Sequence, residues 1–361
     1  MRLVWAVVTG LGSSRRDVQS LAVDLDDGTA GVAVNYCALG GECLVGDRVL
    51  LNTTAVGLGL GTGGNHFVAA RLGEGSGVAF DSPSGGHIMK LRYTPLQRDV
   101  LAVESPERPH HEAMALAETL EGMPVVCCGL HSQVPLVAAA VKGADRGLTV
   151  AYCMTDSASL ALALSDVAHA STDAGLLDTT ITCGQAFGGE LEAVNLHSGL
   201  LAARHVAGAD VAIAAIGPGV VGTATPFGHG GVAQGEAINA ASALGGTPVA
   251  VLRMSFADTR ERHRVVSHHS LAALSRIALA RAIVPMPVLA PEIAVQVDRV
   301  LDSAGVPKRH HVVEVPVSSP PDLRGVEVAT MGRTIAEDPA FFSAAFAAGE
   351  IAARIAKGEG V

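Results

Sequence analysis

The sequence has few aromatic side chains, few charged side chains and no long uninterrupted apolar run. Aromatic residues make up 3% of the 361 residues and charged residues 17%, whereas 49% are hydrophobic and 42 are glycine. This much apolar material can fill a buried core, which excludes an intrinsically disordered chain. The low charge, and the bias toward glycine, alanine and valine, are typical of closely packed α/β layers. The length predicts two domains or one large one.

No segment is predicted to cross a membrane or to direct secretion. The longest stretch without Asp, Glu, Lys or Arg, residues 211–235, contains two prolines and seven glycines, which would break a helix in lipid. The apolar run at residues 3–8 is too short for a secretion signal. Six cysteines lie without a repeated CxxC spacing, so we expect reduced thiols and a cytoplasmic protein.

The net charge is negative, with 25 basic and 35 acidic side chains giving −10. Broad adhesion to nucleic acid or to an anionic membrane is therefore not expected. The first 105 residues carry eight basic and ten acidic side chains, so the N-terminal region is no exception. The composition does not decide whether the protein is a monomer or a homo-oligomer.

Residues 1–105 are predicted to form a small β-barrel-like domain. Short apolar runs recur at residues 3–8, 19–25, 30–35, 48–51, 67–70 and 90–93. Asp26-Asp27-Gly28 between two of these runs is a hairpin signal, and a glycine-rich run at residues 57–64 suits barrel corners. Many short strands with glycine-marked turns favour a barrel or a compact sandwich. A polar connection with two prolines at residues 104–109 marks the boundary.

Residues 106–361 are predicted to form a Rossmann-like α/β domain, doubly wound around a mainly parallel sheet. Predicted strands alternate with predicted helices, which is the pattern of such a sheet. The strands are expected at 124–129, 148–154, 179–183, 211–216, 248–254 and 311–317. The helices are expected at 110–121, 134–142, from Asp156 as a cap, 190–206, 232–244, 271–282, 293–301 and 341–355. Ligands of such sheets bind beyond the carboxyl ends of the strands, where we expect the site.

A glycine motif follows the strand predicted at 211–216. Gly217, Gly219 and Gly222 form a GxGxxG pattern, in which the backbone can approach an anion closely. Pro218 removes one backbone donor from it, and no acidic residue follows at the spacing that a dinucleotide fold needs. A phosphate or carboxylate cradle, a dinucleotide site and a tight structural loop all remain open.

The segment between residues 253 and 281 has the highest density of residues that can bind anions, transfer protons or bind metals. This segment contains six arginines and only two acidic residues. Arg260 and Arg262 are the candidates for binding an anion, because guanidinium groups offer planar, bidentate donors beside a helix whose predicted cap is Ser267. His263 and His268 are the candidate acid–base residues.

The same segment has a second interpretation as a divalent metal site. Imidazole and carboxylate groups are suitable ligands, so the candidates are His263, His268, His269 and Asp258. Asp258 would either bind the metal or orient an imidazole. No HExxH spacing occurs, and exposed histidines or helix caps remain the structural alternative. Cys127 and Cys128 with His131 are a weaker nucleophile–base candidate, since buried cysteine is usually inert packing.

Four long segments stand out in order along the chain: CGLHSQVP (128–135), TCGQAFGGELEAVNLHSGL (182–200), GPGVVGTATPFGHGGVAQGEAINA (217–240) and SFADTRERHRVVSHHS (255–270). Together they resemble an uncharacterised bacterial protein family of similar length, a domain of unknown function. The resemblance spans essentially the whole chain. It implies no activity, cofactor or substrate, so no catalytic residue is carried over.

The leading hypothesis is an enzyme that acts on a small anionic metabolite, phosphorylated or carboxylated, with hydrolase or lyase chemistry slightly favoured. The second hypothesis is a metabolite-sensing or partner-binding module that recognises its ligand without changing it. Both require the glycine turn at 217–222 and the arginine–histidine stretch at 258–269 to face one hollow.

Overall fold

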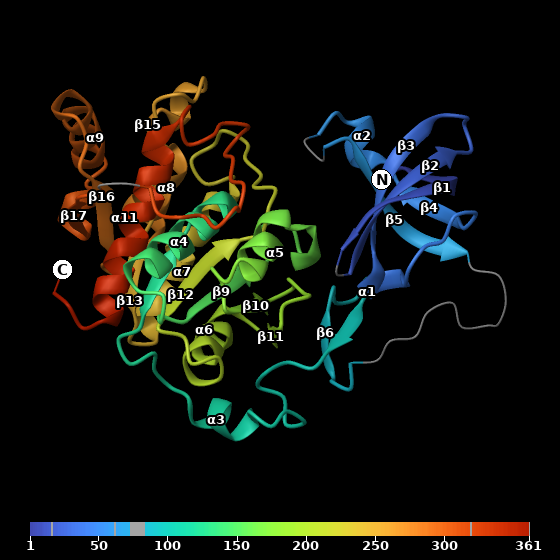
Figure 1. Ribbon diagram of the computed structural model, residues 1–361, viewed down its shortest axis with the longest axis horizontal. Helices are drawn as coiled ribbons and strands as arrows, with labels where there is room; N and C mark the ends of the chain where they lie inside the picture. Colours follow the sequence, from blue (N-terminus) through green and yellow to red (C-terminus); the bar gives the residue numbers. More distant parts are fainter. Residues whose placement is uncertain (16, 61–62, 73–83, 318–319, 361) are drawn as a thin grey trace. The chain divides into compact units, whose positions relative to one another are not determined.

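The computed structural model describes residues 1–15, 17–60, 63–72, 84–317 and 320–360. Their contacts divide the chain into two compact units, Met1–Val100 and Leu101–Val361. The first unit is built on β-strands and the second is a mixed α/β unit (Figure 1). Each unit has hydrophobic core clusters of its own.

The first unit contains a closed barrel of five strands, as the sequence predicts. The strands are β1 (Leu3–Arg15), β2 (Val18–Leu25), β3 (Ala30–Tyr36), β4 (Arg48–Asn52) and β5 (Asn65–Leu72). They neighbour one another in the order β1-β2-β3-β5-β4, and antiparallel pairing of β1 with β4 closes the barrel. Alternate apolar residues such as Ala6 and Val8 fill its interior. The predicted hairpin joins β2 to β3, and Gly28 there has φ +83°.

Four further short elements lie among the described residues of this unit. They are α1 (Cys37–Gly40), α2 (Thr54–Gly57), β6 (Ile88–Lys90) and β7 (Arg98–Val100). β6 and β7 pair antiparallel with each other as a separate two-stranded sheet. The apolar run predicted at 90–93 therefore begins in a hairpin outside the barrel. Residues 61–62 of the glycine-rich run lie outside the described residues.

The second unit is built on a parallel sheet of eight strands, which confirms the predicted doubly wound fold. The strands are β8 (Pro124–Cys127), β9 (Val150–Thr155), β10 (Thr179–Cys183), β11 (Leu191–Ala193), β12 (Val211–Ile216), β13 (Thr247–Ala250), β16 (Ile283–Pro287) and β17 (His311–Val315). They neighbour one another in the order β11-β10-β9-β12-β8-β13-β16-β17. The sequence prediction missed β16, because Pro285 and Pro287 argue against a strand. It also missed the three-residue β11, where it placed the start of a helix.

Helices cover both faces of this sheet (Figure 1). One face packs against α4 (Val134–Ala144), α5 (Asp166–Asp173) and α11 (Pro339–Ala356). The other packs against α3 (His111–Leu116), α6 (Leu196–His205), α7 (Ala233–Ala243), α9 (Pro291–Ser303) and α10 (Val306–Arg309). Successive residues of a strand enter opposite cores, Val126 on the first face and Val125 on the second. Both faces are therefore apolar, as the low charge of the sequence predicts.

The local helix signals succeeded in one case and failed in another. Ser267 caps α8 (His268–Ala272) as predicted, and its hydroxyl accepts a hydrogen bond from the His269 amide at 3.2 Å. Asp156, however, does not cap a helix. The cap of α5 is Ser165, whose hydroxyl accepts from the Ala168 amide at 2.9 Å, while the Asp156 carboxylate accepts from the Gln185 amide at 2.9 Å. A carboxylate at a strand end can bind any nearby amide, and tertiary contacts decided which one.

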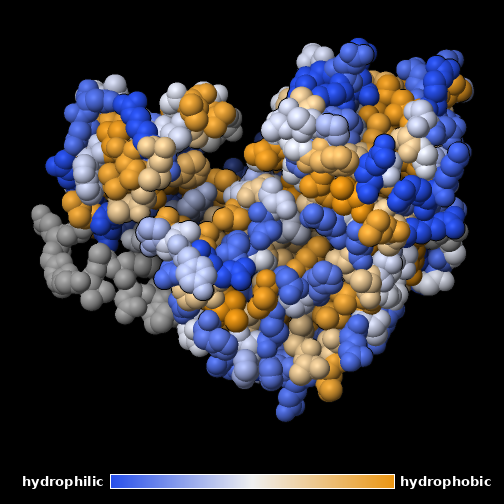
Figure 2. Space-filling model, turned by 180° about the vertical axis from the view of Figure 1, so that it is seen from behind, coloured by the Kyte–Doolittle hydropathy of each residue, from blue (hydrophilic) through white to orange (hydrophobic). Residues whose placement is uncertain are grey.

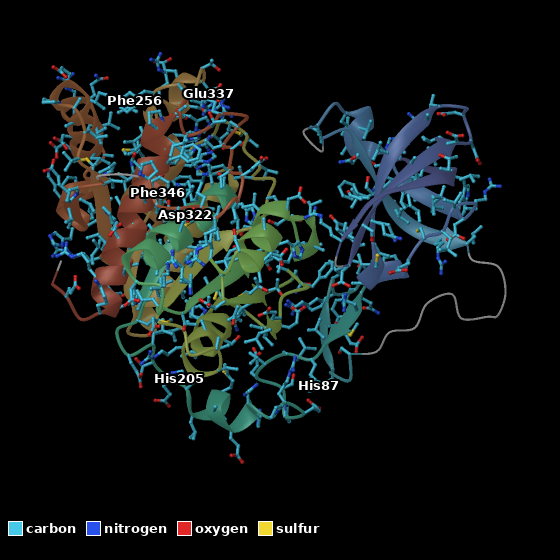
Figure 3. The ribbon with its side chains drawn as sticks, viewed as in Figure 1. His87, His205, Phe256, Asp322, Glu337 and Phe346 are labelled. Carbon is cyan, nitrogen blue, oxygen red and sulfur yellow. The ribbon has the colours of Figure 1, made fainter. Side chains whose placement is uncertain are left out.

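Within the described residues, no helix combines the length and apolarity needed to span a membrane. The surface facing the viewer in Figure 2 mixes hydrophilic and hydrophobic side chains. The largest apolar side chains of α11, such as Phe346, lie inside the α/β unit (Figure 3).

Candidate functional site

The site lies beyond the carboxyl ends of the central strands, where the chain changes direction across the sheet. β8 leads through α4 on one face to β9, and β12 leads through α7 on the other face to β13. Because β12 lies between β9 and β8, these two connections run in opposite directions from neighbouring strands. Such a switch point opens a crevice between the loops that follow the strands.

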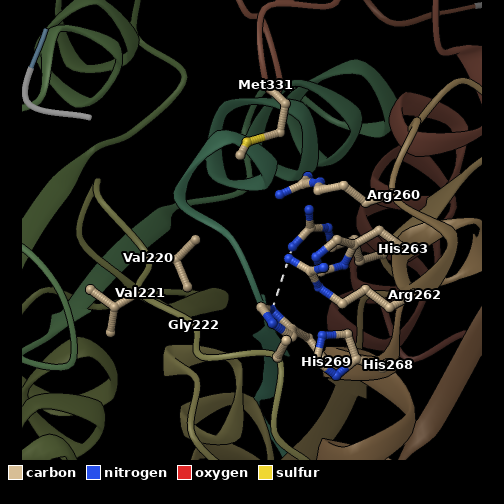
Figure 4. Close-up of a pocket in the computed structure, with 11 residues that line it drawn as sticks. Val220, Val221, Gly222, Arg260, Arg262, His263, His268, His269 and Met331 are labelled. Atoms are coloured by element: carbon tan, nitrogen blue, oxygen red, sulfur yellow. Dashed lines mark hydrogen bonds between the residues drawn. The ribbon is translucent and has the colours of Figure 1, made fainter. Parts of the chain in front are cut away.

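A hollow of about 160 Å³ occupies this edge, and both predicted segments reach it (Figure 4). Its lining consists of Val220, Val221, Gly222, Ala224, Arg253, Arg260, Arg262, His263, His268, His269 and Met331. The loop after β12 thus meets the arginine–histidine stretch, as the hypothesis requires. Ala224, Arg253 and Met331 line the hollow from outside these two segments.

Only Gly222 of the three motif glycines lines the hollow. A Cβ on Gly217 would lie 2.6 Å from the Ser159 carbonyl oxygen, so glycine is needed there for close packing of two loops. Gly219 has φ +90°, a conformation that other residues rarely adopt. Gly217 and Gly219 therefore shape the loop itself. Of the three glycines expected to bind an anion, Gly222 alone lines the hollow.

A tight turn after the motif brings in His229, which the sequence analysis did not select. Gly222 forms a β-bridge with His229, and the Thr223 amide donates to the Gly228 carbonyl at 2.8 Å. The turn folds His229 back toward α8, about forty residues further along the chain. In the sequence, a histidine among several glycines is the only sign that this position is unusual. Its neighbours in space become known only once the loop is closed in the structure.

Four imidazoles pack together at this point, those of His229, His263, His268 and His269. The His229 and His269 rings are parallel, with centroids 3.9 Å apart and an interplanar angle of 6°. The His268 ring stands on edge to both, at 5.1 Å from His229 and 4.5 Å from His269. The His263 ring lies 5.0 Å from both His268 and His269. All but His268 are more than nine-tenths buried.

Hydrogen bonds orient three of these rings. The Nε2 of His229 lies 3.1 Å from the Pro226 carbonyl oxygen, and the Nδ1 of His263 lies 2.7 Å from the Ser267 hydroxyl. The Nδ1 of His269 lies 3.4 Å from the Arg253 guanidinium, which can only donate. His229 Nδ1 and His268 Nε2 are buried and have no hydrogen-bond partner among the described residues.

Burial lowers the pKa of every imidazole in the cluster. It lowers the pKa of His263 to about 3 and that of His269 to about 2, and nearby Arg253 and the neighbouring histidines add to the effect. The pKa values of His229 and His268 are lowered for the same first reason. The four rings are therefore neutral at pH 7, which suits proton acceptors or metal ligands rather than imidazolium acids.

Arginines surround the buried carboxylate of Asp258 beside the histidines. Asp258 Oδ1 accepts from Arg260 Nε at 2.9 Å, and Oδ2 accepts from Arg260 Nη2 at 2.7 Å. Arg333 and Arg253 approach the same Oδ2 at 3.4 and 3.8 Å. Both carboxylate oxygens thus accept hydrogen bonds from a guanidinium group. The hydrogen bonds from Arg260 hold the pKa of Asp258 well below its usual range.

The predicted role of Asp258 is therefore corrected. We expected it to orient an imidazole or to bind a metal, but its carboxylate hydrogen-bonds to arginines and to no histidine within the described part of the chain. It holds the side chain of Arg260 at the hollow. Asp338 extends the network, accepting from Arg333 Nε at 3.0 Å and from the Ser255 hydroxyl at 2.7 Å.

The weaker nucleophile–base candidate forms a structural network instead. His131 Nδ1 lies 3.0 Å from the Tyr152 hydroxyl, which donates to the Ile216 carbonyl at 3.2 Å. His131 Nε2 lies 2.5 Å from the hydroxyl of Ser165, the cap of α5. Neither cysteine of the pair is available as a nucleophile, because burial raises the pKa of Cys127 and Cys128.

Histidines elsewhere in the α/β unit do not join the cluster. His205 lies at the end of α6, where its Nε2 is 2.8 Å from the Thr119 carbonyl oxygen. Figure 3 shows it at the opposite end of this unit from Glu337, which belongs to the loop before α11.

Comparison with known proteins identifies a family without an assigned activity. Neither a curated protein nor a solved structure matches the chain. Residues 32–349 match the family described as "Protein of unknown function (DUF3866)". This match covers nearly the whole chain, from within β3 of the barrel through the site to α11, so the chain belongs to that family.

Proposed function

We propose that the α/β unit is an enzyme that acts on a small anionic metabolite, phosphorylated or carboxylated, bound in the hollow at the carboxyl edge of the sheet. The observation that carries the proposal is Arg262. It is exposed, lines the hollow, and has no ion-pair or hydrogen-bond partner for its guanidinium within the described ranges. An unpaired guanidinium in a concave site is a ready donor to phosphate or carboxylate.

The charge around Arg262 supports an anionic ligand. Four guanidinium groups (Arg253, Arg260, Arg262 and Arg333) gather here, and the ion pairs of the described residues join three of them to two carboxylates, Asp258 and Asp338. Guanidinium groups therefore outnumber the carboxylates paired with them, which favours a negatively charged ligand. A phosphoryl group, which carries about −1.5 to −2 at pH 7, matches that excess. The volume of the hollow, about 160 Å³, suits a small metabolite.

Each side chain at the hollow has a role in this proposal. Arg262 and Arg260 bind the anion, and Asp258 orients Arg260 through two parallel hydrogen bonds. His263 is the candidate proton acceptor, because its imidazole lines the hollow and its Nδ1 is held by Ser267. Fixed guanidinium groups aimed at developing negative charge would supply most of the rate enhancement. Hydrolases and lyases that act on anionic substrates use such a combination of anion-binding groups and a proton acceptor.

Binding of inorganic phosphate and of citrate by the full chain, measured calorimetrically in the presence of EDTA, tests the anion site. We expect Arg262→Ala to weaken binding about 10- to 150-fold, because a hydrogen bond to a charged group contributes about 1.5–3 kcal/mol. Arg264→Ala is the matched control, since Arg264 is exposed two residues away and does not line the hollow. Equal losses in both variants, or no saturable binding to the wild type, would contradict the proposal.

Turnover separates the enzyme from the sensing module. A panel of phosphate esters and hydroxy acids is incubated with the wild type and with His263→Gln. We expect the wild type to consume at least one compound and the variant to lose most of that activity while still binding phosphate. Intact binding without any turnover would support metabolite recognition without catalysis.

A further inference from the structure

We infer that His229, His268 and His269 form a binding site for one divalent d-block cation such as zinc, at the edge of the anion hollow. One ring nitrogen of each histidine lies within 4.8 Å of the others. Two different segments supply them, the turn that follows β12 and the first residues of α8. The set differs from the one expected from the sequence, because His229 takes the place of His263 and Asp258.

Two buried nitrogens without partners are the strongest evidence for this site. His229 is 4% exposed, yet its Nδ1 has no hydrogen-bond partner among the described residues, and the same holds for Nε2 of His268. Leaving a buried polar atom unsatisfied costs about 1–3 kcal/mol. Buried polar atoms in native proteins are nearly always paired with another protein group, an ordered water or an ion. A shared cation would satisfy both nitrogens at once.

The hydrogen bond on the far side of His229 prepares its Nδ1 for a metal. A backbone carbonyl can only accept, so the 3.1 Å contact with Pro226 places the ring proton on Nε2. Nδ1 then carries a free lone pair directed away from that carbonyl. Metal-bound histidines almost always donate their other ring nitrogen in this way.

The rings of His229 and His268 already have the spacing of a metal-bound pair. Imidazoles bound to one zinc at about 2.0–2.1 Å with a near-tetrahedral angle have centroids roughly 5 Å apart. The observed separation is 5.1 Å, and the planes meet at 70°. The His269 ring is parallel to that of His229, so it must turn about its Cβ–Cγ bond to direct a nitrogen at the same ion. That turn breaks the long 3.4 Å contact with Arg253 and the parallel stacking on His229.

Glycine makes the convergence of these rings sterically possible. A Cβ on Gly231 would lie 2.8 Å from the Cβ of His269 and 3.0 Å from Nδ1 of His229. Contacts that short force the neighbours to shift. The chain therefore has no side chain where the two imidazoles approach each other, and any side chain there would separate them.

The donor set indicates the kind of metal and its state of coordination. Neutral imidazoles suit zinc and other d-block cations, whereas calcium and magnesium prefer oxygen ligands. Three protein ligands leave a fourth position open, as in catalytic rather than structural zinc sites. His268 and His269 also line the hollow, so an ion bound to them would lie at its edge, beside Arg253, Arg260 and Arg262. That contact with a bound anion, unlike the metal site itself, rests on the proposed function.

Zinc titration of the EDTA-treated full chain, in phosphate-free buffer against a chromophoric chelator, tests the inference. We expect one equivalent to bind the wild type with submicromolar affinity, and the affinity to fall at least about 100-fold in His229→Ala and in His268→Ala. His205→Ala is the control, because His205 lies at the end of α6 and outside the cluster. Circular dichroism verifies that each variant is folded.

Cobalt substitution provides a readout that a merely structural role would not change. Cobalt in a site with three nitrogen ligands is expected to show visible d–d bands in the wild type and in His205→Ala, and none in His229→Ala. The inference is overturned if the wild type binds no stoichiometric zinc, or if His229→Ala and His268→Ala both keep the wild-type affinity. Because anion binding is measured with EDTA present, failure of the anion site would be seen separately.

Discussion

Replacing Asp258 by asparagine is expected to lower the free energy of unfolding of the α/β unit by about 1.5–3 kcal/mol at pH 7, the contribution of a hydrogen bond to a charged group. The side chain of Asp258 is 2% exposed, and its two oxygens accept both hydrogen bonds from Arg260. Arg333 and Arg253 lie within 4 Å of the same carboxylate. The amide keeps the size of the side chain but removes the charge, so the buried guanidinium of Arg253 and the partly exposed ones of Arg260 and Arg333 lose their partner.

Urea unfolding followed by circular dichroism at 222 nm measures this loss, because the long helices all lie in the α/β unit. The only tryptophan, Trp5, lies in the barrel, and its fluorescence transition should stay unchanged. Glu121→Gln is the control, since that carboxylate is 54% exposed and pairs with Arg204. An exposed pair contributes about 0–1 kcal/mol. A loss for Asp258→Asn no larger than that of the control would refute the reasoning.

The same variant predicts a pH dependence with a defined sign. The folded-state pKa of Asp258 lies below its unfolded value, so the carboxylate stabilises the fold above about pH 4 and less as the pH falls. The difference in unfolding free energy between the wild type and Asp258→Asn should therefore stay constant from pH 5 to 8 and shrink below pH 4. A difference that grows on acidification would contradict the assigned direction.

Three further predictions concern packing and reactivity in the same unit. Gly231→Ala should weaken zinc binding more than tenfold and destabilise the unit by about 1–3 kcal/mol, because the added Cβ meets His229 Nδ1 at 3.0 Å. His131→Phe should cost about 1–3 kcal/mol in urea unfolding, since it leaves the hydroxyls of its two partners without the imidazole. Cys127 and Cys128 should react with Ellman's reagent only on unfolding, because burial raises their pKa.

Controls for these predictions come from the same chain. Gly143→Ala, at an exposed position in α4 where a Cβ would lie 3.4 Å from its nearest neighbour, should be neutral or stabilising. His205→Phe should cost less than His131→Phe. Cys37, which is only partly buried, should react before the cysteine pair. Zinc affinity unchanged by Gly231→Ala, a stable His131→Phe, or rapid labelling of the pair in the native state would each contradict the corresponding assignment.

Features encoded over a few residues could be predicted from the sequence. Short apolar runs predicted the five barrel strands, although a sixth run at 90–93 begins outside the barrel, and Asp26-Asp27-Gly28 predicted the turn between two of the strands. Apolar runs alternating with helical segments predicted the parallel sheet. Ser267 was identified as a helix cap because capping depends on the next two or three residues. Where local rules conflict with the tertiary structure, as with the prolines of β16, prediction failed.

The sequence by itself determined that glycines and an arginine–histidine stretch would follow strands of one sheet, and hence that they would meet at its carboxyl edge. Only the tertiary structure decided which groups touch. His229 reaches His268 because a loop closes, and Asp258 meets Arg333 across 75 residues rather than a histidine nearby. The physical reason is that strand periodicity and caps are set by neighbours along the chain, whereas side-chain partners depend on strand order and loop closure.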